Sequence, residues 1–149
     1  MKKINKQSGF TLIEILVVIG IIAILAAVVI VALNPARQFA QARNTQRSAN
    51  VNAILNAVWQ RMVDNKGLWN STCATVTVTL PATATNIGTG VGLINLEDCV
   101  VATYLPSMVM DPSGGTATDT GYTIAKDASG RITIAAPSAE LSVAISVVR

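Results

Sequence analysis

A single carboxylate, Glu14, stands at the start of a long apolar run, and residues 15–33 after it include no charged side chain. An ionised carboxylate inside a membrane segment costs about 2.5–3.5 kcal/mol on insertion scales, so it favours a cation beside it. The chain has no histidine and shows no evident pair of reactive carboxylates. Glu14 therefore indicates ion pairing with an amine, and nothing in the sequence supports an enzyme.

A candidate cleavage site lies just before this run. A leader with three lysines ends at Ser8-Gly9, and Phe10 follows directly. An ordinary secretory signal is cleaved after its apolar region, which is then lost. Cleavage after Gly9 would instead create an amino terminus at Phe10 on a chain that keeps its apolar segment. The new amine could pair with Glu14 of the same chain or of a neighbouring copy.

The string KQSGFTLIE, residues 6–14, resembles the processing site of type IV prepilins and of the related pseudopilins. In that family a membrane-embedded aspartyl peptidase cuts after the glycine and methylates the new amino terminus. The resemblance implies that Gly9 is the last leader residue, that Phe10 is methylated and that Glu14 is the carboxylate used in assembly. An uncleaved single-pass anchor with a chance Gly-Phe pair is the alternative.

The apolar run has the length of a membrane span. Its 19 residues, 15–33, form about 28 Å of helix at roughly 1.5 Å per residue, close to the ~30 Å of a bilayer core. The basic flank before it predicts a cytoplasmic leader and an external C-terminal side. Many members of the resembled family carry a proline inside this segment, where Val31 stands here, and the first proline is Pro35.

The net charge of +3 comes from the leader. Three of the 11 lysines and arginines lie in residues 1–9, which leaves eight basic against eight acidic residues. The positive charge therefore indicates that the leader lies on the cytoplasmic side of the membrane, and it gives little support to nucleic-acid binding.

Two cysteines, Cys73 and Cys99, follow the anchor and so lie on the exported side. An even number of cysteines in an exported module favours a disulfide. Closing this loop of about 27 residues would stabilise the fold by roughly 3.5 kcal/mol in the chain-entropy model. Two free buried thiols are the alternative.

A second helix is predicted after Asn34-Pro35, because residues 36–66 lack further proline or glycine and Gly67 provides a stop. We expect one long helix over about residues 10–66, bent or interrupted at Asn34-Pro35. Its second half has an apolar face with Trp59 at the edge, formed by Val51, Ile54, Leu55, Val58 and Met62.

The remaining residues predict a small β-rich head. Alternating residues indicate strands at 73–80, 122–126, 131–135 and 141–148, with a loop over 81–92 and a short helix within 93–105. The expected fold is α+β, with the long helix packed on an antiparallel sheet, as in a pilin. The predicted segments are a leader (1–9), a membrane and assembly helix (10–34), an amphipathic continuation (35–67) and a head (68–149) with a disulfide-bounded loop (73–99).

Two further clusters have competing interpretations. Arg43, Arg47 and Arg61 share a helix face, which suits either a DNA-binding stripe or salt bridges between subunits, and the second is favoured. Asp111 and Asp119 could bind calcium, as in some pseudopilins, but their spacing matches no defined calcium loop and turn chemistry explains both. We expect no other cofactor.

The leading hypothesis is a structural subunit of a type IV pilus-like filament, anchored in the cytoplasmic membrane before assembly and exposed at the cell surface afterwards. The resemblance implies three kinds of partner: other copies of the chain in a helical homopolymer, a prepilin peptidase and the membrane-bound assembly machinery. The alternatives are a type II secretion pseudopilin or a minor pilin. A more remote alternative is a membrane-anchored module that binds DNA or a surface ligand and does not polymerise.

Overall fold

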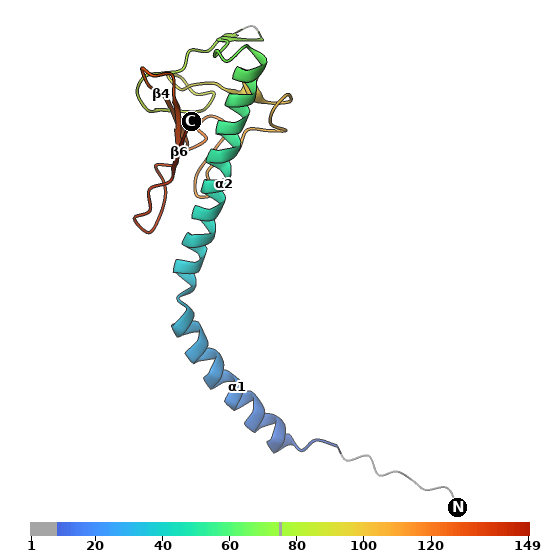
Figure 1. The fold of residues 1–149 in the computed structure, drawn as a ribbon. Helices are drawn as coiled ribbons and strands as arrows, with labels where there is room; N and C mark the ends of the chain where they lie inside the picture. Colours follow the sequence, from blue (N-terminus) through green and yellow to red (C-terminus); the bar gives the residue numbers. More distant parts are fainter. Residues whose placement is uncertain (1–8, 75) are drawn as a thin grey trace, which may run out of the picture. The chain divides into compact units, whose positions relative to one another are not determined.

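The computed structural model describes residues 9–74 and 76–149. The chain forms two compact units, of which the first ends at Gln38 and the second comprises Phe39–Arg149 (Figure 1). Residues 1–8 of the predicted leader lie outside the described residues, and the four-segment division remains a prediction.

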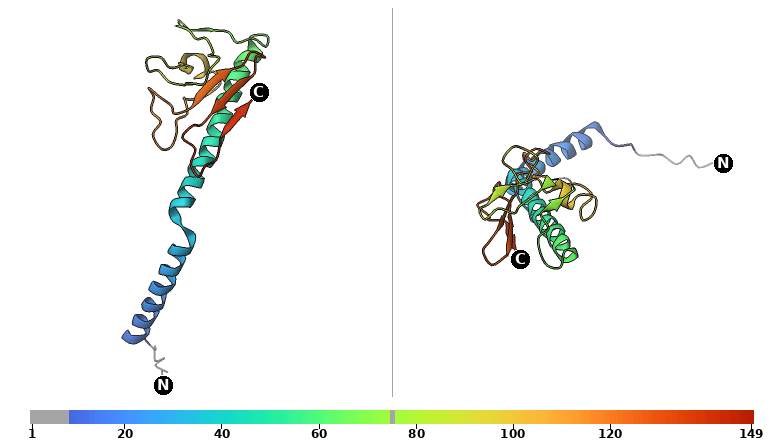
Figure 2. Two further views of the ribbon diagram at one scale, coloured as in Figure 1. Left: turned by 90° about the vertical axis from the view of Figure 1, so that its left-hand side faces the viewer. Right: turned by 90° about the horizontal axis from the view of Figure 1, so that it is seen from above.

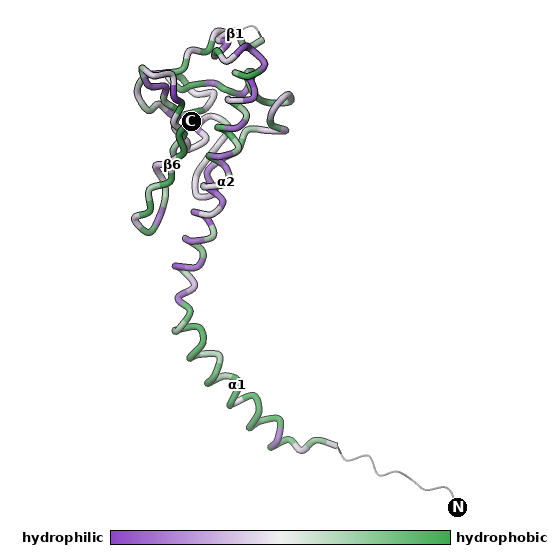
Figure 3. Tube along the Cα trace, viewed as in Figure 1, coloured by the Kyte–Doolittle hydropathy of each residue, from purple (hydrophilic) through white to green (hydrophobic). Residues whose placement is uncertain are grey.

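Helix α1, Leu12–Leu33, is apolar around its whole circumference. None of its 22 residues is buried, and Figure 3 shows hydrophobic colouring along nearly all of its length. By length and composition it could cross a membrane. At about 1.5 Å per residue it measures about 33 Å, the thickness of a bilayer core. The helix continues through Val31 without a break.

The predicted interruption at Asn34-Pro35 is present. Asn34 adopts a left-handed conformation with φ 41°, and helix α2, Pro35–Asp64, begins at the next residue. A residue before proline avoids the helical region, and asparagine tolerates the left-handed one better than most residues. The Asn34 side chain also accepts a bond of 3.4 Å from the Arg37 N–H. The break therefore follows from local chemistry.

The amphipathic face of α2 is buried as predicted, and Trp59 is partly buried at its edge. The helix ends before Gly67, whose N–H donates to the Met62 carbonyl at 2.8 Å and whose φ of 83° is the left-handed value that glycine readily adopts. The stop predicted at Gly67 is thus confirmed.

The head combines a small hairpin, a short helix and an antiparallel sheet. The sheet has the strand order β3-β4-β5-β6, and Figure 2 shows its strands alongside α2. The elements after α2 are β1 (Thr72–Cys73), β2 (Val76–Thr77), β3 (Thr85–Asn86), α3 (Glu97–Val100), β4 (Thr123–Lys126), β5 (Ile132–Ala135) and β6 (Ser146–Val148).

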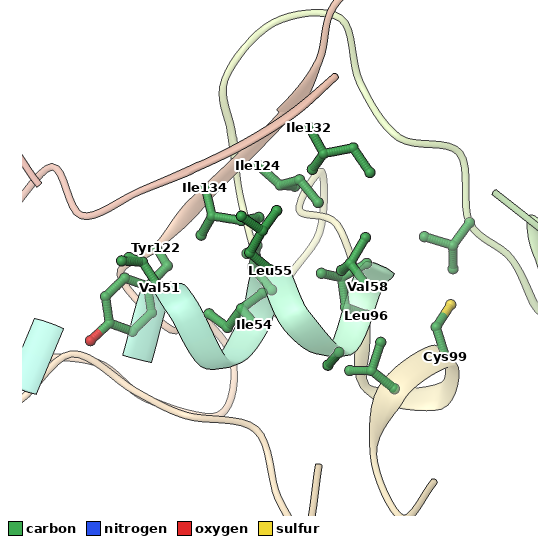
Figure 4. Packing of buried hydrophobic residues seen from close by; sticks show 14 of the residues in the cluster. Val51, Ile54, Leu55, Val58, Leu96, Cys99, Tyr122, Ile124, Ile132 and Ile134 are labelled. Carbon is green, nitrogen blue, oxygen red and sulfur yellow. The ribbon is translucent and has the colours of Figure 1, made fainter. Parts of the chain in front are cut away.

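The core lies between α2 and the central strands. Figure 4 shows α2 side chains, among them Leu55, directed at Ile124 of β4 and at Ile132 and Ile134 of β5. All three isoleucines are fully buried. Burial of this apolar surface fixes which face of α2 meets the sheet.

The predicted α+β fold is confirmed, as are the β4–β5 hairpin and the short helix near Cys99. The single strand predicted over 73–80 is wrong, because Ala74 has a φ of 50° and the chain folds back into the β1–β2 hairpin. The loop predicted over 81–92 contains β3, which pairs with β4. Only the end of the strand predicted over 141–148 forms β6, since Leu141 and Ser142 have positive φ.

Candidate assembly site

The carboxylate of Glu14 caps the first turn of α1. Thr11, the N-cap residue, donates to Glu14 Oε2 from both its backbone N–H and its hydroxyl at 2.8 Å, and its Oγ1 accepts from the Glu14 N–H at 3.3 Å. The two residues thus form a complete capping box. The cap satisfies polar groups that would otherwise be unpaired at the start of an apolar helix.

This position also suits a negative charge. The N-terminal end of a helix carries about half a positive charge from its aligned peptide dipoles. Glu14 lies in the first turn, so its carboxylate meets both that partial charge and the two Thr11 donors. The same carboxylate would be poorly placed one or two turns further into the apolar segment, where no donor is available.

Gly9 and Phe10 precede the helix and are exposed, with 86% of Phe10 accessible. The Thr11 N–H that donates to Glu14 belongs to the residue next to Phe10. Consecutive Cα atoms lie about 3.8 Å apart. An amine created at Phe10 would therefore arise one residue away from a group already bonded to the carboxylate.

Thr11 is a residue of this site that was not predicted from the sequence. The sequence does contain the pattern that predicts its role: Thr11 and Glu14 have the Thr-x-x-Glu spacing of a capping box before an apolar run. The prediction treated Glu14 only as a partner for an amine and began the helix near Phe10, whereas α1 begins at Leu12.

The predicted Cys73–Cys99 disulfide is present. Cys73 lies in β1 and Cys99 in α3, and both are buried. The bond joins the small hairpin to the short helix beside the core.

Arg47 is fully buried and donates to two carboxylates of the head. Its Nε and Nη2 contact Asp111 at 2.6 and 3.1 Å, and its Nη1 contacts Glu140 at 2.9 Å. It also donates to Asn44 Oδ1 and Ser113 Oγ at 2.9 and 2.7 Å. All three guanidinium nitrogens are therefore used within the chain.

The same contacts alter the acidity of the carboxylates. Bonds from Arg43, and then from Arg47, lower the pKa of Glu140 to about 2. Burial acts to raise the pKa of Asp111, but the bonds from Arg47 and the Ser113 N–H outweigh it, so that this pKa lies below its usual value. The bonds to Asp111 are the main reason that the pKa of Arg47 is raised.

The three arginines that suited either a DNA-binding stripe or, as favoured, salt bridges between subunits have partners within their own chain. Arg43 binds Glu140 through two bonds of 2.6 and 2.7 Å, Arg47 is buried, and Arg61 donates to main-chain carbonyls of the head. A guanidinium that binds within its own chain is less available for a row of phosphate contacts or for a salt bridge to another subunit. The helical wheel correctly placed the three arginines on one face of α2, but it could not show that this face is turned toward the head.

The aspartates considered for calcium have other partners. Asp111 binds Arg47, while Asp119 accepts from the Asn86 amide at 2.8 Å and from the Gly121 N–H at 2.9 Å. Within the described residues, no group of three or more His, Cys, Asp or Glu side chains is arranged to hold a metal ion. Turn and ion-pair chemistry accounts for both side chains, and calcium binding stays the disfavoured alternative.

Comparison with known proteins supports the N-terminal assignment. Residues 4–30 match the family model for the prokaryotic N-terminal methylation motif. The chain is 39% identical over 83 residues to the type IV wide pilus major component PilA4 of Thermus thermophilus, a match that covers 56% of this chain and 62% of that relative. No solved structure matches the chain significantly. The methylation motif, the α+β architecture and this relative confirm the resemblance to type IV prepilins.

Proposed function

We propose that the chain is a structural subunit of a type IV pilus-like filament, cleaved after Gly9 and polymerised through α1. The observation that carries the proposal is the surface of α1. Every residue of this 22-residue helix is exposed and nearly all are apolar, with one carboxylate at its start. Such a surface requires lipid or other apolar helices around it. The membrane supplies lipid before assembly, and neighbouring copies in the filament supply apolar helices afterwards.

The subunit would exist in two environments. Before assembly, α1 anchors it in the cytoplasmic membrane with the head outside, and the prepilin peptidase removes the leader. After assembly, α1 packs against its copies through small residues, and a head-to-tail contact that does not close produces a helical fibre at the cell surface. The small residues of α1 are Gly20, Ala23, Ala26, Ala27 and Ala32.

Glu14 would have a different partner in each environment. In the membrane, the Thr11 cap lowers the cost of its charge. In the fibre, its partner is the amine that cleavage creates at Phe10 of the same or a neighbouring copy. This amine provides a full positive charge beside the Glu14 carboxylate in a place without water. Assembly thus becomes a step that neutralises two charges.

A pair of variants separates the charge of Glu14 from its capping role. Glu14→Gln keeps an oxygen that can accept from the Thr11 N–H but removes the charge. Thr11→Val keeps the charge but removes the hydroxyl of the capping box. Each variant is co-expressed with a tagged wild-type chain, fibres are sheared from the cells, and incorporation is measured by mass spectrometry.

If pairing with the amine drives assembly, Glu14→Gln is cleaved and stays in the membrane, while Thr11→Val enters fibres nearly as well as wild type. The reverse result would show that assembly needs the helix cap and not the charge. A wild-type chain that is never recovered in sheared fibres, although cleaved, would contradict the filament itself. An N-methylated Phe10 in the fibre fraction would support both processing and assembly.

A further inference from the structure

Arg61, in the last turn of α2, donates to carbonyls next to both half-cystines. Its Nη1 donates to the Cys99 carbonyl at 3.0 Å, and its Nη2 donates to the Thr72 carbonyl at 2.7 Å. Thr72 directly precedes Cys73 in the sequence. One guanidinium thus joins the backbone of β1 to that of α3, the same two elements that the disulfide joins through sulfur.

Further contacts hold Arg61 in this place. Its Nη2 and Nε also donate to the Asn70 carbonyl at 3.2 and 3.4 Å, and its guanidinium lies 5.5 Å from the centre of the Trp69 ring. The Trp69 Nε1 in turn donates to the Val78 carbonyl at 2.8 Å, across the β1–β2 hairpin. The acceptors are main-chain oxygens and an aromatic face. Both lie next to the β1–β2 hairpin, so these contacts fix Arg61 against the hairpin.

A neighbouring contact secures the chain beyond α3. The Tyr104 hydroxyl donates to Asp64 Oδ2 at 2.7 Å, three residues further along α2 than Arg61. The end of α2 therefore binds the chain at Cys99, beyond it at Tyr104, and before Cys73 at Thr72. All of these bonds can exist without a sulfur–sulfur bond.

We propose that Arg61 is a positioning residue that closes the base of the 74–98 loop and brings the Cys73 and Cys99 thiols together before they are oxidised. The exported chain can then fold first and form its disulfide afterwards, and reduction of the disulfide leaves the loop closed. This proposal concerns the second unit alone and does not depend on the proposed filament role.

The test measures the effective concentration of one thiol at the other. Oxidised glutathione reacts with the reduced protein by two successive thiol–disulfide exchanges. Two protein thiols become one protein disulfide, while one oxidised glutathione becomes two glutathione thiols. The equilibrium constant of this balanced reaction has units of concentration and reports how well the folded chain juxtaposes the two thiols.

The measurement uses the full-length chain in detergent micelles, as wild type, Arg61→Met, Arg61→Lys and Arg131→Met. Arg131 is the matched control, because its side chain is exposed and its one salt bridge among the described residues is to Asp127 in the same hairpin turn. Loss of charge-assisted bonds predicts an effective concentration about 10- to 100-fold lower for Arg61→Met. We expect an intermediate value for Arg61→Lys, since one ammonium cannot reach three carbonyls, and no change for Arg131→Met.

A second measurement keeps Arg61 and removes the sulfurs. In Cys73→Ala/Cys99→Ala, amide hydrogen exchange should keep the Val78 and Tyr104 amides protected, since these donate to Ser71 and Val100 in the native structure. Loss of this protection in an otherwise folded second unit would overturn the proposal. A wild-type effective concentration in Arg61→Met would overturn it as well, since apolar packing would then position the thiols without the guanidinium.

Discussion

Helices α1 and α2 differ in how far their apolar side chains are buried and in whether their side chains have partners within the chain. Every residue of α1 is exposed, including large apolar ones such as Ile22 at 57%. In α2 one apolar face is buried, with Val51, Ile54 and Val58 at 0%, although Phe39 and Val63 are exposed. Two of its arginines bind carboxylates of the same chain. Figure 3 shows the contrast as a continuous hydrophobic helix and a mixed one.

The difference indicates where the partners of each helix are found. The second unit buries its own apolar surface and pairs its own buried charges, so its stability should respond to substitutions within the chain. The surface of α1 has no such internal balance, so its residues should matter for processing, membrane residence and contacts with other copies. Four predictions test this division.

The largest expected effect is at the cleavage site. In Gly9→Val the bulkier residue should block processing almost completely and leave a precursor heavier by the nine residues 1–9. Mass spectrometry of the membrane fraction measures this, and alkylation without reduction should still find Cys73 and Cys99 oxidised. A variant that matures at the normal mass would refute the proposed site, and free thiols would show that the two units are not independent.

The next largest effect is expected for Arg47→Met. The substitution leaves the Asp111 carboxylate buried without its cation, and removing one partner of a buried pair typically destabilises by about 3–5 kcal/mol. Both tryptophans of the chain, Trp59 and Trp69, lie in the second unit, so denaturation followed by their fluorescence reports on that unit. Arg131→Met, at an exposed pair, should change the midpoint little. Equal effects of the two variants would argue against a stabilising role for the buried network.

A pair of isoleucines sharpens the comparison directly. Ile54→Ala removes a fully buried side chain, which should destabilise the second unit by about 2–5 kcal/mol. Ile22→Ala makes the same chemical change on α1, where the side chain is exposed, and should leave the fluorescence-detected unfolding unchanged. A comparable loss in both variants would mean that α1 contributes to the stability of the second unit.

The smallest effect is the pH dependence of Glu140. Its pKa is about 2 in the folded chain, against an ordinary value of 4.5. Its contribution to stability is therefore complete above about pH 4.5 and is lost as the pH falls through 2. Denaturation of wild type and Glu140→Gln should differ by a constant amount above pH 5 and converge near pH 2. A difference that persists unchanged at pH 2 would mean that the ion pairs with Arg43 and Arg47 are not its source.

The amino-acid sequence by itself determined the features that depend on local chemistry. These include the apolar span of α1, the break at Asn34, the stop at Gly67 and the β4–β5 hairpin with its turn at residues 127–130. Each follows from a run of like residues or from a backbone preference that needs no distant contact. The Thr11–Glu14 cap belongs to the same class, since its spacing alone specifies it.

Only the tertiary structure decided which groups meet across the chain. Arg47 and Asp111 are separated by 64 residues, and Arg43 and Glu140 by 97, and no local preference encodes such pairings. The same holds for β3, a two-residue strand whose pairing with β4 spans a long loop. A helical wheel places three arginines on one face, but burial of the apolar stripe beside them decides that the face turns inward. The orientation of a helix in its fold is set by the free energy of the whole core, which no segment of the sequence specifies alone.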